Sequence, residues 1–153
     1  MDPLVGVVLV MVALAAGMLA RVGAPPWTRG VYGRANDRDD QARVHPVANT
    51  AALDPLFAAG CVAPAVLFLH DPGCPISRVA YRQMMRLDRD ILLIDVRRAH
   101  GLSRDVEERT GVRHESPQAI VLRQGRAVWS ASHDGITTRA VADALRQACG
   151  EAS

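Results

Sequence analysis

The apolar residues of the C-terminal region fall into short blocks separated by polar residues, Gly and Pro. Two continuous apolar runs, at 65–69 and 91–94, have the length and composition of strands that are covered on both faces. Between them, residues 75–87 repeat apolar positions with the period of an amphipathic helix. The apolar face of this predicted helix consists of Ile76, Ala80, Met84 and Leu87. Two strands joined by a helix are expected to run parallel, with a right-handed crossover.

The same reasoning predicts the remaining elements of this region. They are a helix at 51–59 between Thr50 and Gly60, a helix at 103–110 that stops at Gly111, strands at 119–122 and 127–129 around the turn Gln124-Gly125, and a last helix capped by Thr137 or Thr138. On the last helix, the apolar face holds Val141, Ala144 and Leu145. The order α-β-α-β-α-β-β-α predicts an α/β fold with a four-stranded mixed sheet flanked by helices, which is the thioredoxin-like arrangement.

The N-terminal segment has a different pattern, because residues 4–20 carry no charged side chain. This length is near the lower limit for crossing a bilayer, about 17 residues, and we predict an N-terminal transmembrane helix at residues 1–20. Residues that suit a membrane surface follow it: Arg21, Trp27, Arg29, Tyr32 and Arg34. Since basic residues stay on the cytoplasmic side, we expect a single-pass protein of the cell membrane whose domain faces the cytoplasm. Two alternatives stay open, a signal peptide cleaved near Val22-Gly23-Ala24 and a plain buried helix.

Residues 21–49 combine Gly, Pro and charged residues and show neither a helical nor a strand period. A segment of this kind buries too little apolar surface to order itself. We therefore predict three parts: an anchor at 1–20, a flexible linker at 21–49 and a thioredoxin-like domain at 50–153.

The charges of the chain are nearly balanced, with a formal net charge of +2. Apart from histidine, every basic residue is Arg, and the Arg residues are interspersed with acidic ones. Aromatic residues make up only 4% of the chain, so few rings are available to stack on bases. These features speak against a nucleic-acid-binding protein.

The three cysteines, Cys61, Cys74 and Cys149, form neither a C-x-x-C pair nor a zinc-type spacing. Because no pair of histidines has metal-ligand spacing either, we expect no metal site. An odd number of cysteines leaves at least one free thiol. Cys61 and Cys149 are candidate resolving thiols, and the alternative for each is a packed or surface thiol without a redox role.

Cys74 is the main candidate for chemistry. It follows the strand-breaking segment Asp71-Pro72-Gly73 at the carboxyl end of the first core strand, where open α/β sheets place their reactive groups. Free N–H groups at a helix start favour a thiolate, and Pro75 suits the first helical turn. Ser77 stands where a dithiol enzyme has its second cysteine, and it either donates a hydrogen bond to the sulfur or is a solvated serine. The alternative for Cys74 is a buried, inert cysteine.

Basic side chains near Cys74 have two interpretations. Arg78 lies one helical turn after Cys74, so it either meets the thiolate or an anionic substrate group, or belongs to an exposed stripe with Arg82 and Arg86. A histidine near the site would tune the thiolate or carry protons, and a histidine elsewhere would be hydrogen-bonded or exposed. The histidines with these two interpretations are His70, His114 and His133.

Three blocks of sequence together resemble a known family. They are Cys74-Pro75-Ile76-Ser77, His114-Glu115-Ser116-Pro117-Gln118 and residues 125–137, with Val128-Trp129, Ala131-Ser132-His133 and Ile136-Thr137. In this order they are similar to the YtxJ-type monothiol bacilliredoxins of the thioredoxin superfamily, over about residues 50–148. The chain departs from the family in its N-terminal extension at 1–49 and in Gly73, where a polar residue is expected.

The resemblance implies a thioredoxin fold and an enzyme that removes bacillithiol, or a similar small thiol, from mixed disulfides on proteins. Cys74 would be the nucleophile of this thiol-disulfide oxidoreductase. The bond before Pro117 would be cis and face Cys74, and the backbone of Ser116 would pair with an extended substrate. No bound cofactor is implied. The partners would be S-thiolated client proteins and bacillithiol as co-substrate.

Two functions of other classes stay open at this point. Some monothiol thioredoxin-like proteins hold an iron–sulfur cluster with one cysteine and an external thiol, so a non-catalytic carrier is the first alternative. The second is an extracytoplasmic thiol-redox protein, which requires the opposite orientation in the membrane or a cleaved signal peptide.

Overall fold

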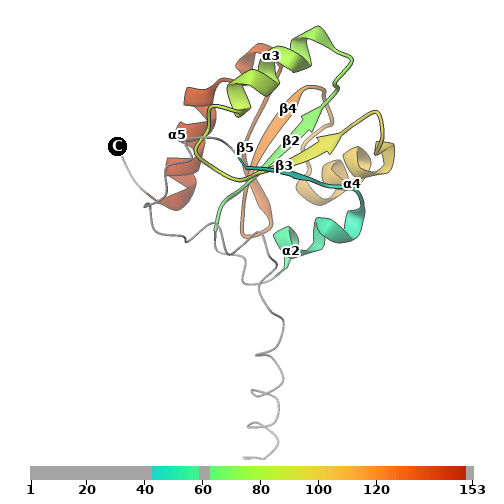
Figure 1. The fold of residues 1–153 in the computed structure, drawn as a ribbon. Coiled ribbons are helices and arrows are strands. Elements are labelled where there is room, and N and C mark those ends of the chain that lie inside the picture. Colours follow the sequence, from blue (N-terminus) through green and yellow to red (C-terminus); the bar gives the residue numbers. More distant parts are fainter. Residues whose placement is uncertain (1–42, 59–62, 151–153) are drawn as a thin grey trace, which may run out of the picture.

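The computed structural model describes residues 43–58 and 63–150 as an α/β domain built on one mixed sheet (Figure 1). The strands are β1 (Val44–Pro46), β2 (Ala65–His70), β3 (Ile91–Asp95), β4 (Gln118–Arg123) and β5 (Arg126–Ser132). The helices are α2 (Asp54–Phe57), α3 (Pro75–Met84), α4 (His100–Thr110) and α5 (Thr138–Cys149), with short 3-10 helices η3 (Thr50–Ala52) and η4 (His133–Gly135). The strand order is β1-β3-β2-β4-β5. Strands β1, β3 and β2 are parallel to one another, and β4 runs antiparallel to both of its neighbours, β2 and β5. The thioredoxin-like arrangement is confirmed.

The prediction of four strands was wrong, because the sheet has a fifth strand, β1, at its edge. Val44 is opposite Ile91, and the backbone of Val47 donates to Leu93 O at 2.8 Å. This strand lies inside the range 21–49, which the sequence predicts to be a linker. Three residues are too few to show a period of two, and Pro46 is tolerated since an edge strand needs few ladder donors.

The predicted anchor at 1–20 and the rest of the linker to residue 42 lie outside the described residues. Within 43–58 and 63–150, no helix combines the length and apolarity that a membrane crossing requires.

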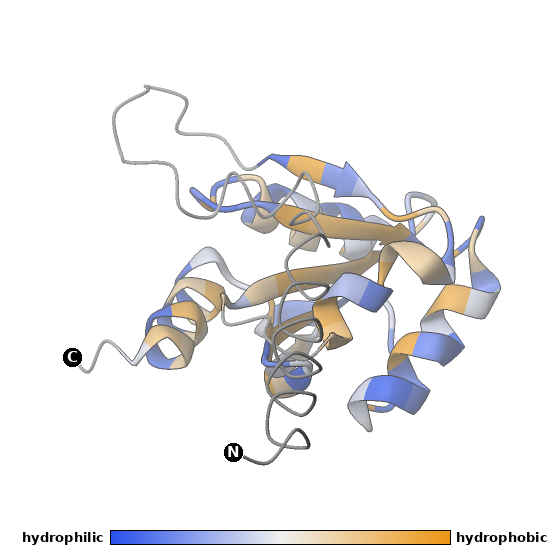
Figure 2. Cartoon of the chain, turned by 90° about the horizontal axis from the view of Figure 1, so that it is seen from below, coloured by the Kyte–Doolittle hydropathy of each residue, from blue (hydrophilic) through white to orange (hydrophobic). Residues whose placement is uncertain are grey.

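The sheet is covered on both faces, because its central strands alternate large apolar residues between two clusters. Val66 and Phe68 of β2 pack against α3 and α5, and Leu67 and Leu69 pack against α2 and α4. Figure 1 shows the two pairs of helices on opposite sides of the sheet, and Figure 2 shows hydrophobic strands between helices with hydrophilic outer faces. This doubly covered sheet explains why β2 and β3 read as continuous apolar runs.

Three predicted helices have different limits in the structure, and the one predicted at 103–110, α4, begins at His100. The helix predicted at 51–59 is split into η3 and α2, and Asn49 rather than Thr50 caps it by accepting from Ala52 N at 3.0 Å. The helix predicted at 75–87 ends at Met84, and Ile76, which was expected on its buried face, is 52% exposed. Its first turn therefore extends past the cover of the sheet.

The predicted hairpin turn, the helix end at Gly111 and the cap at Thr137 are confirmed, whereas the predicted helix end at Gly60 lies outside the described residues. Gln124 and Gly125 have φ values of 51° and 73°, which suit a two-residue hairpin. Gly111 ends α4 with φ 69°, and the Thr137 side chain accepts from Ala140 N to cap α5.

Candidate active site

Cys74 lies at the junction between β2 and α3, as the sequence predicts. It is the N-cap residue of α3 and is partly exposed rather than buried, and its reactivity stays a prediction. Its N–H donates to Asp71 O at 3.1 Å, and the Asp71 side chain accepts from Gly73 N at 2.8 Å. Asp71 thus fixes the turn that presents the sulfur at the start of the helix. Pro75 occupies the first helical turn, where its missing N–H costs nothing.

Ser77 makes hydrogen bonds that the sequence did not predict. Its side chain is fully buried, at 0% exposure, so the alternative of a solvated serine is wrong. Its Oγ lies 2.7 Å from His70 Nδ1 and accepts a hydrogen bond from Asp71 N at 3.0 Å. A hydroxyl has one proton, so when Ser77 donates to His70 it has none for the sulfur of Cys74. At the position where a dithiol enzyme has its second cysteine, this chain therefore has a serine whose hydroxyl makes structural hydrogen bonds.

His70 is the last residue of β2 and is 8% exposed. Its ring stacks on Phe68 at 5.6 Å and lies 5.0 Å from the Tyr81 ring. Burial lowers the pKa of His70 from its usual 6.5, although the carboxylates of Asp95 and Asp71 act in the opposite direction. The imidazole is therefore neutral at physiological pH, and it ties the end of β2 to the first turn of α3.

The peptide bond between Ser116 and Pro117 is cis, which confirms the prediction. It immediately precedes β4, and Gln118 pairs with Leu69 near the end of β2. Ser116 and Pro117 therefore lie at the same end of the sheet as Cys74. The N–H of His133 donates to Pro117 O at 3.1 Å, so η4 also supports this segment.

Gln118 is a supporting residue that the sequence did not reveal. It is 4% exposed, and its side chain donates to Arg113 O at 2.8 Å and accepts from Glu115 N at 3.3 Å. These hydrogen bonds close the loop that carries Ser116 and Pro117. A buried Gln just after a proline is the signal that could have identified it, since such a side chain must find partners.

All three candidate histidines lie at this end of the domain. His133 Nδ1 lies 3.7 Å from Glu115 Oε2, and both side chains are about half exposed. His114 donates from its backbone to Glu107 Oε2, whereas its Nδ1 and the Ser116 hydroxyl are buried without a hydrogen-bond partner among the described residues. No cluster of possible metal ligands occurs in residues 43–58 and 63–150.

The first turns of α3 expose both apolar and basic side chains beside Cys74. Ile76 and Val79 are 52% and 51% exposed, which is unusual for large apolar residues. The basic stripe is also exposed, with Arg78 and Arg82 on α3 and Arg86 just after its end. The exposed side chains Ile76 and Val79 thus form a small apolar patch on the first turns of the helix that Cys74 caps.

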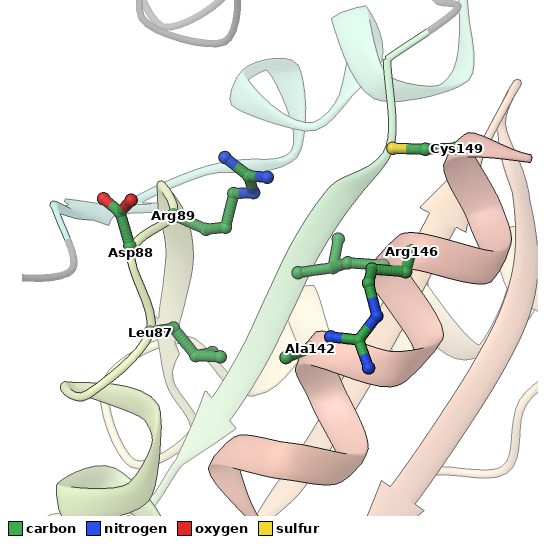
Figure 3. A pocket seen from close by; sticks show the side chains of 7 residues that line it. Leu87, Asp88, Arg89, Ala142, Arg146 and Cys149 are labelled. Atoms are coloured by element: carbon green, nitrogen blue, oxygen red, sulfur yellow. The ribbon is translucent and has the colours of Figure 1, made fainter. Parts of the chain in front are cut away.

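Cys149 is exposed at the end of α5, beside the segment that precedes β3 (Figure 3). The two segments line a pocket of about 260 Å³ that includes Leu87, Arg89 and Arg146. Because β2 and β3 are parallel, the start of β3 lies at the opposite end of the sheet from Cys74. In this arrangement Cys149 does not face Cys74. Cys61 lies outside the described residues, and a resolving role for either thiol stays a prediction.

The comparisons with known proteins agree with this geometry. The family described as "Monothiol bacilliredoxin BrxC" matches residues 46–141. Among solved structures, a protein with a thioredoxin fold has a TM-score of 0.61 and 24% identity over 78% of this chain and 98% of its own. Thioredoxin f from spinach chloroplast, in its short form, has a TM-score of 0.54 and 18% identity over 73% and 98%. Thioredoxin from Trypanosoma brucei brucei has a TM-score of 0.57 and 12% identity over 72% and 95%. At these identities the solved structures establish the fold alone.

Proposed function

The chain belongs to the monothiol bacilliredoxin family, and from this premise we propose that it removes bacillithiol from mixed disulfides on client proteins. The family and the fold make it a thiol oxidoreductase in general. The observation that carries the finer proposal is the pairing of a partly exposed Cys74 at a helix start with a buried, hydrogen-bonded Ser77. One sulfur is present at the two positions where dithiol enzymes have two.

The proposed reaction has two exchanges at Cys74. Its thiolate attacks the bacillithiol sulfur of the mixed disulfide, a new disulfide forms on Cys74, and the client leaves as a thiolate that takes a proton from water. The thiolate of a second bacillithiol molecule then attacks the adduct. This step releases bacillithiol disulfide and restores the Cys74 thiolate. Each exchange breaks one disulfide bond and forms another, so no bound redox cofactor is needed.

Local features support each step. Backbone N–H groups at the start of α3 are free to hydrogen-bond an anionic sulfur, because the first turn of a helix has no internal acceptors. The backbone of Ser116 is available next to the end of β2 to pair with an extended client segment. Ile76 and Val79 offer apolar contact beside the sulfur. Ser77 cannot form a disulfide, so the adduct waits for an external thiol.

The test is transfer of the adduct, measured by intact mass. A defined protein that carries bacillithiol is incubated with the wild type and with Cys74→Ser. The proposal predicts that the client loses the adduct only with the wild type and that the adduct is found on this chain. Transfer by Cys74→Ser would assign the activity to another residue. A brown protein with visible absorption and no transfer would instead favour the iron–sulfur carrier.

We also propose that the apolar run at residues 4–20 anchors the domain at the cytoplasmic face of the cell membrane. The support is its lack of charge and the Arg residues that follow it. Labelling of intact cells with a membrane-impermeant thiol reagent tests the orientation. The proposal predicts that Cys74 is labelled only after lysis, and labelling in intact cells would place the domain outside.

A further inference from the structure

The backbone just before the reactive cysteine lies against an arginine from a different part of the chain. A Cβ at Gly73 would lie 2.6 Å from Arg97 Nη1, so the guanidinium occupies the space of a side chain at this position. The described glycines with positive φ are Gly111, Gly125 and Gly150, so the backbone of Gly73 does not itself demand glycine. Gly73 is instead a position where the absence of a side chain lets Arg97 approach.

The sheet brings these two residues together. In the parallel pair of β2 and β3, His70 is opposite Asp95, so the segments that follow the two strands run side by side. The N–H of Arg97 donates to Asp95 Oδ1 at 3.0 Å, which turns the chain directly after β3. Arg97 therefore lies over the turn that presents Cys74, although the two residues are far apart in sequence.

The guanidinium of Arg97 makes no hydrogen bond or ion pair with any residue in the described ranges, whereas the nearby carboxylates have partners. Asp71 Oδ1 accepts from Gly73 N, and Asp95 Oδ2 lies 3.6 Å from Arg98 Nε. Arg97 is exposed, so it is free to meet a ligand from solvent. Its planar fork of N–H donors fits a carboxylate in two-point contact.

Arg97 also lines a pocket of about 360 Å³ together with Pro72, Asp95 and Arg98. A pocket of roughly 300–1,000 Å³ is the usual size for a small-molecule site. Pro72 connects it to the turn before Cys74. A small molecule in this pocket would thus have a cationic partner within reach of the position where its sulfur reacts.

We propose that Arg97 binds a carboxylate of the small thiol that exchanges at Cys74, so that the domain prefers anionic low-molecular-weight thiols over neutral ones. The inference rests on the proposed function and adds the chemical class of the co-substrate. In the exchange, Cys74 attacks a small disulfide, one half stays on Cys74 as a mixed disulfide, and the other half leaves as a thiolate. Arg97 changes no bond and only holds the half that stays.

The test uses two reagents of similar size and different charge: the disulfide of N-acetylcysteine, which carries carboxylates, and the disulfide of N-acetylcysteine amide, which is neutral. The full chain with Cys61→Ser and Cys149→Ser retains Cys74 as its one thiol. The rate of adduct formation on Cys74 is followed by mass spectrometry, and the quantity of interest is the ratio of the carboxylate rate to the amide rate. Within each variant, this ratio cancels differences in thiolate content.

Arg97→Ala is expected to lower this ratio about two- to five-fold, equivalent to about 0.4–1 kcal/mol at 1.4 kcal/mol per factor of ten. Arg104→Ala is the charge control, because Arg104 is an exposed arginine of α4 that pairs with Glu108. It should leave the ratio unchanged. Added salt should lower the ratio of the Arg97-containing protein and narrow its difference from Arg97→Ala.

Gly73→Ala provides a second variant, which keeps the charge of Arg97 but moves it. The new Cβ would lie 2.6 Å from Arg97 Nη1 and 3.2 Å from Asp71 Oδ1, so it would displace the flexible end of Arg97 and shift the Asp71 carboxylate slightly, and the ratio should again fall. An unchanged ratio in Arg97→Ala, or an equal fall in Arg104→Ala, would overturn the inference. Since no client protein takes part, failure to act on a bacillithiolated client would refute the proposed function without altering this result.

Discussion

Replacement of Ser77 by Ala tests whether the buried hydrogen bonds beneath Cys74 hold the site together. The hydroxyl is inaccessible to solvent, and it bonds to His70 Nδ1 at 2.7 Å and to Asp71 N at 3.0 Å. Its removal leaves two polar groups without this partner. An unsatisfied buried group costs about 1–3 kcal/mol. Asp71 is only partly buried, so water can replace one bond, and Ala returns about 0.5 kcal/mol of helix propensity.

The expected net loss for Ser77→Ala is therefore about 0.5–2.5 kcal/mol in the free energy of unfolding, measured by urea denaturation. Ser103→Ala is a matched control on α4. Ser103 is also buried, at 6% exposure, but its Oγ has no hydrogen-bond partner among the described residues. Loss of that hydroxyl leaves nothing unpaired, so its cost should stay within about 0.5 kcal/mol of zero or be favourable.

A double-mutant cycle identifies the partner. His70→Phe keeps an aromatic ring next to Phe68 and Tyr81 and removes Nδ1. The double variant with Ser77→Ala should cost less than the sum of the single variants by about 1 kcal/mol. Equal costs for Ser77→Ala and Ser103→Ala, or strict additivity in the cycle, would refute the reasoning.

Three further predictions concern the pH dependence of His70, two turn glycines and a second thiol at position 77. Burial lowers the pKa of His70 below 6.5, so as pH falls the unfolded chain takes up the proton before the folded chain does. The contribution of neutral His70 to stability is therefore complete above pH 6.5 and is lost as pH falls below it. His70→Phe should remove this part of the pH dependence of the free energy of unfolding, measured by urea denaturation at a series of pH values. Gly125→Ala should lower stability more than Gly111→Ala, for which about 1 kcal/mol of backbone strain is expected. A Cβ at Gly125 would lie 3.2 Å from Phe57 Cα, whereas one at Gly111 would meet nothing within 4 Å. Equal losses of stability in thermal unfolding would contradict this. Ser77→Cys should allow a disulfide with Cys74, which would release a small thiol bound to Cys74 without attack by a second small thiol. Counting the free thiols by mass after oxidation would reveal this disulfide. Persistence of both thiols would show that the buried position is closed to this exchange.

The position of Cys74 between β2 and α3 could be predicted because its signals are contiguous. An apolar run, a Pro-Gly break and a Pro at the first helical turn lie within residues 65–75, and local sequence alone determines each of them. The helix end at Gly111, the cap at Thr137 and the hairpin turn are local in the same way. The edge strand β1 was missed because its extended conformation depends on pairing with Ile91 and Leu93 rather than on its own composition.

The partners of Ser77 and Gly73 could not be predicted, because they depend on how distant elements pack. The hydrogen bond between Ser77 and His70 depends on the angle at which α3 leaves β2. The approach of Arg97 to Gly73 requires the register between β2 and β3. From the sequence, Gly73 is only a departure from the family pattern, whereas the structure gives it a physical reason.

The central claim is that the sulfur of Cys74 alone carries the exchange. The direct measurement is the rate at which the full chain with Cys61→Ser and Cys149→Ser removes bacillithiol from a client protein, compared with the wild type. If one thiol suffices, the two rates are equal and Cys74→Ser has none. A large loss of rate in the chain that keeps only Cys74 would contradict the claim and give a second cysteine a necessary role.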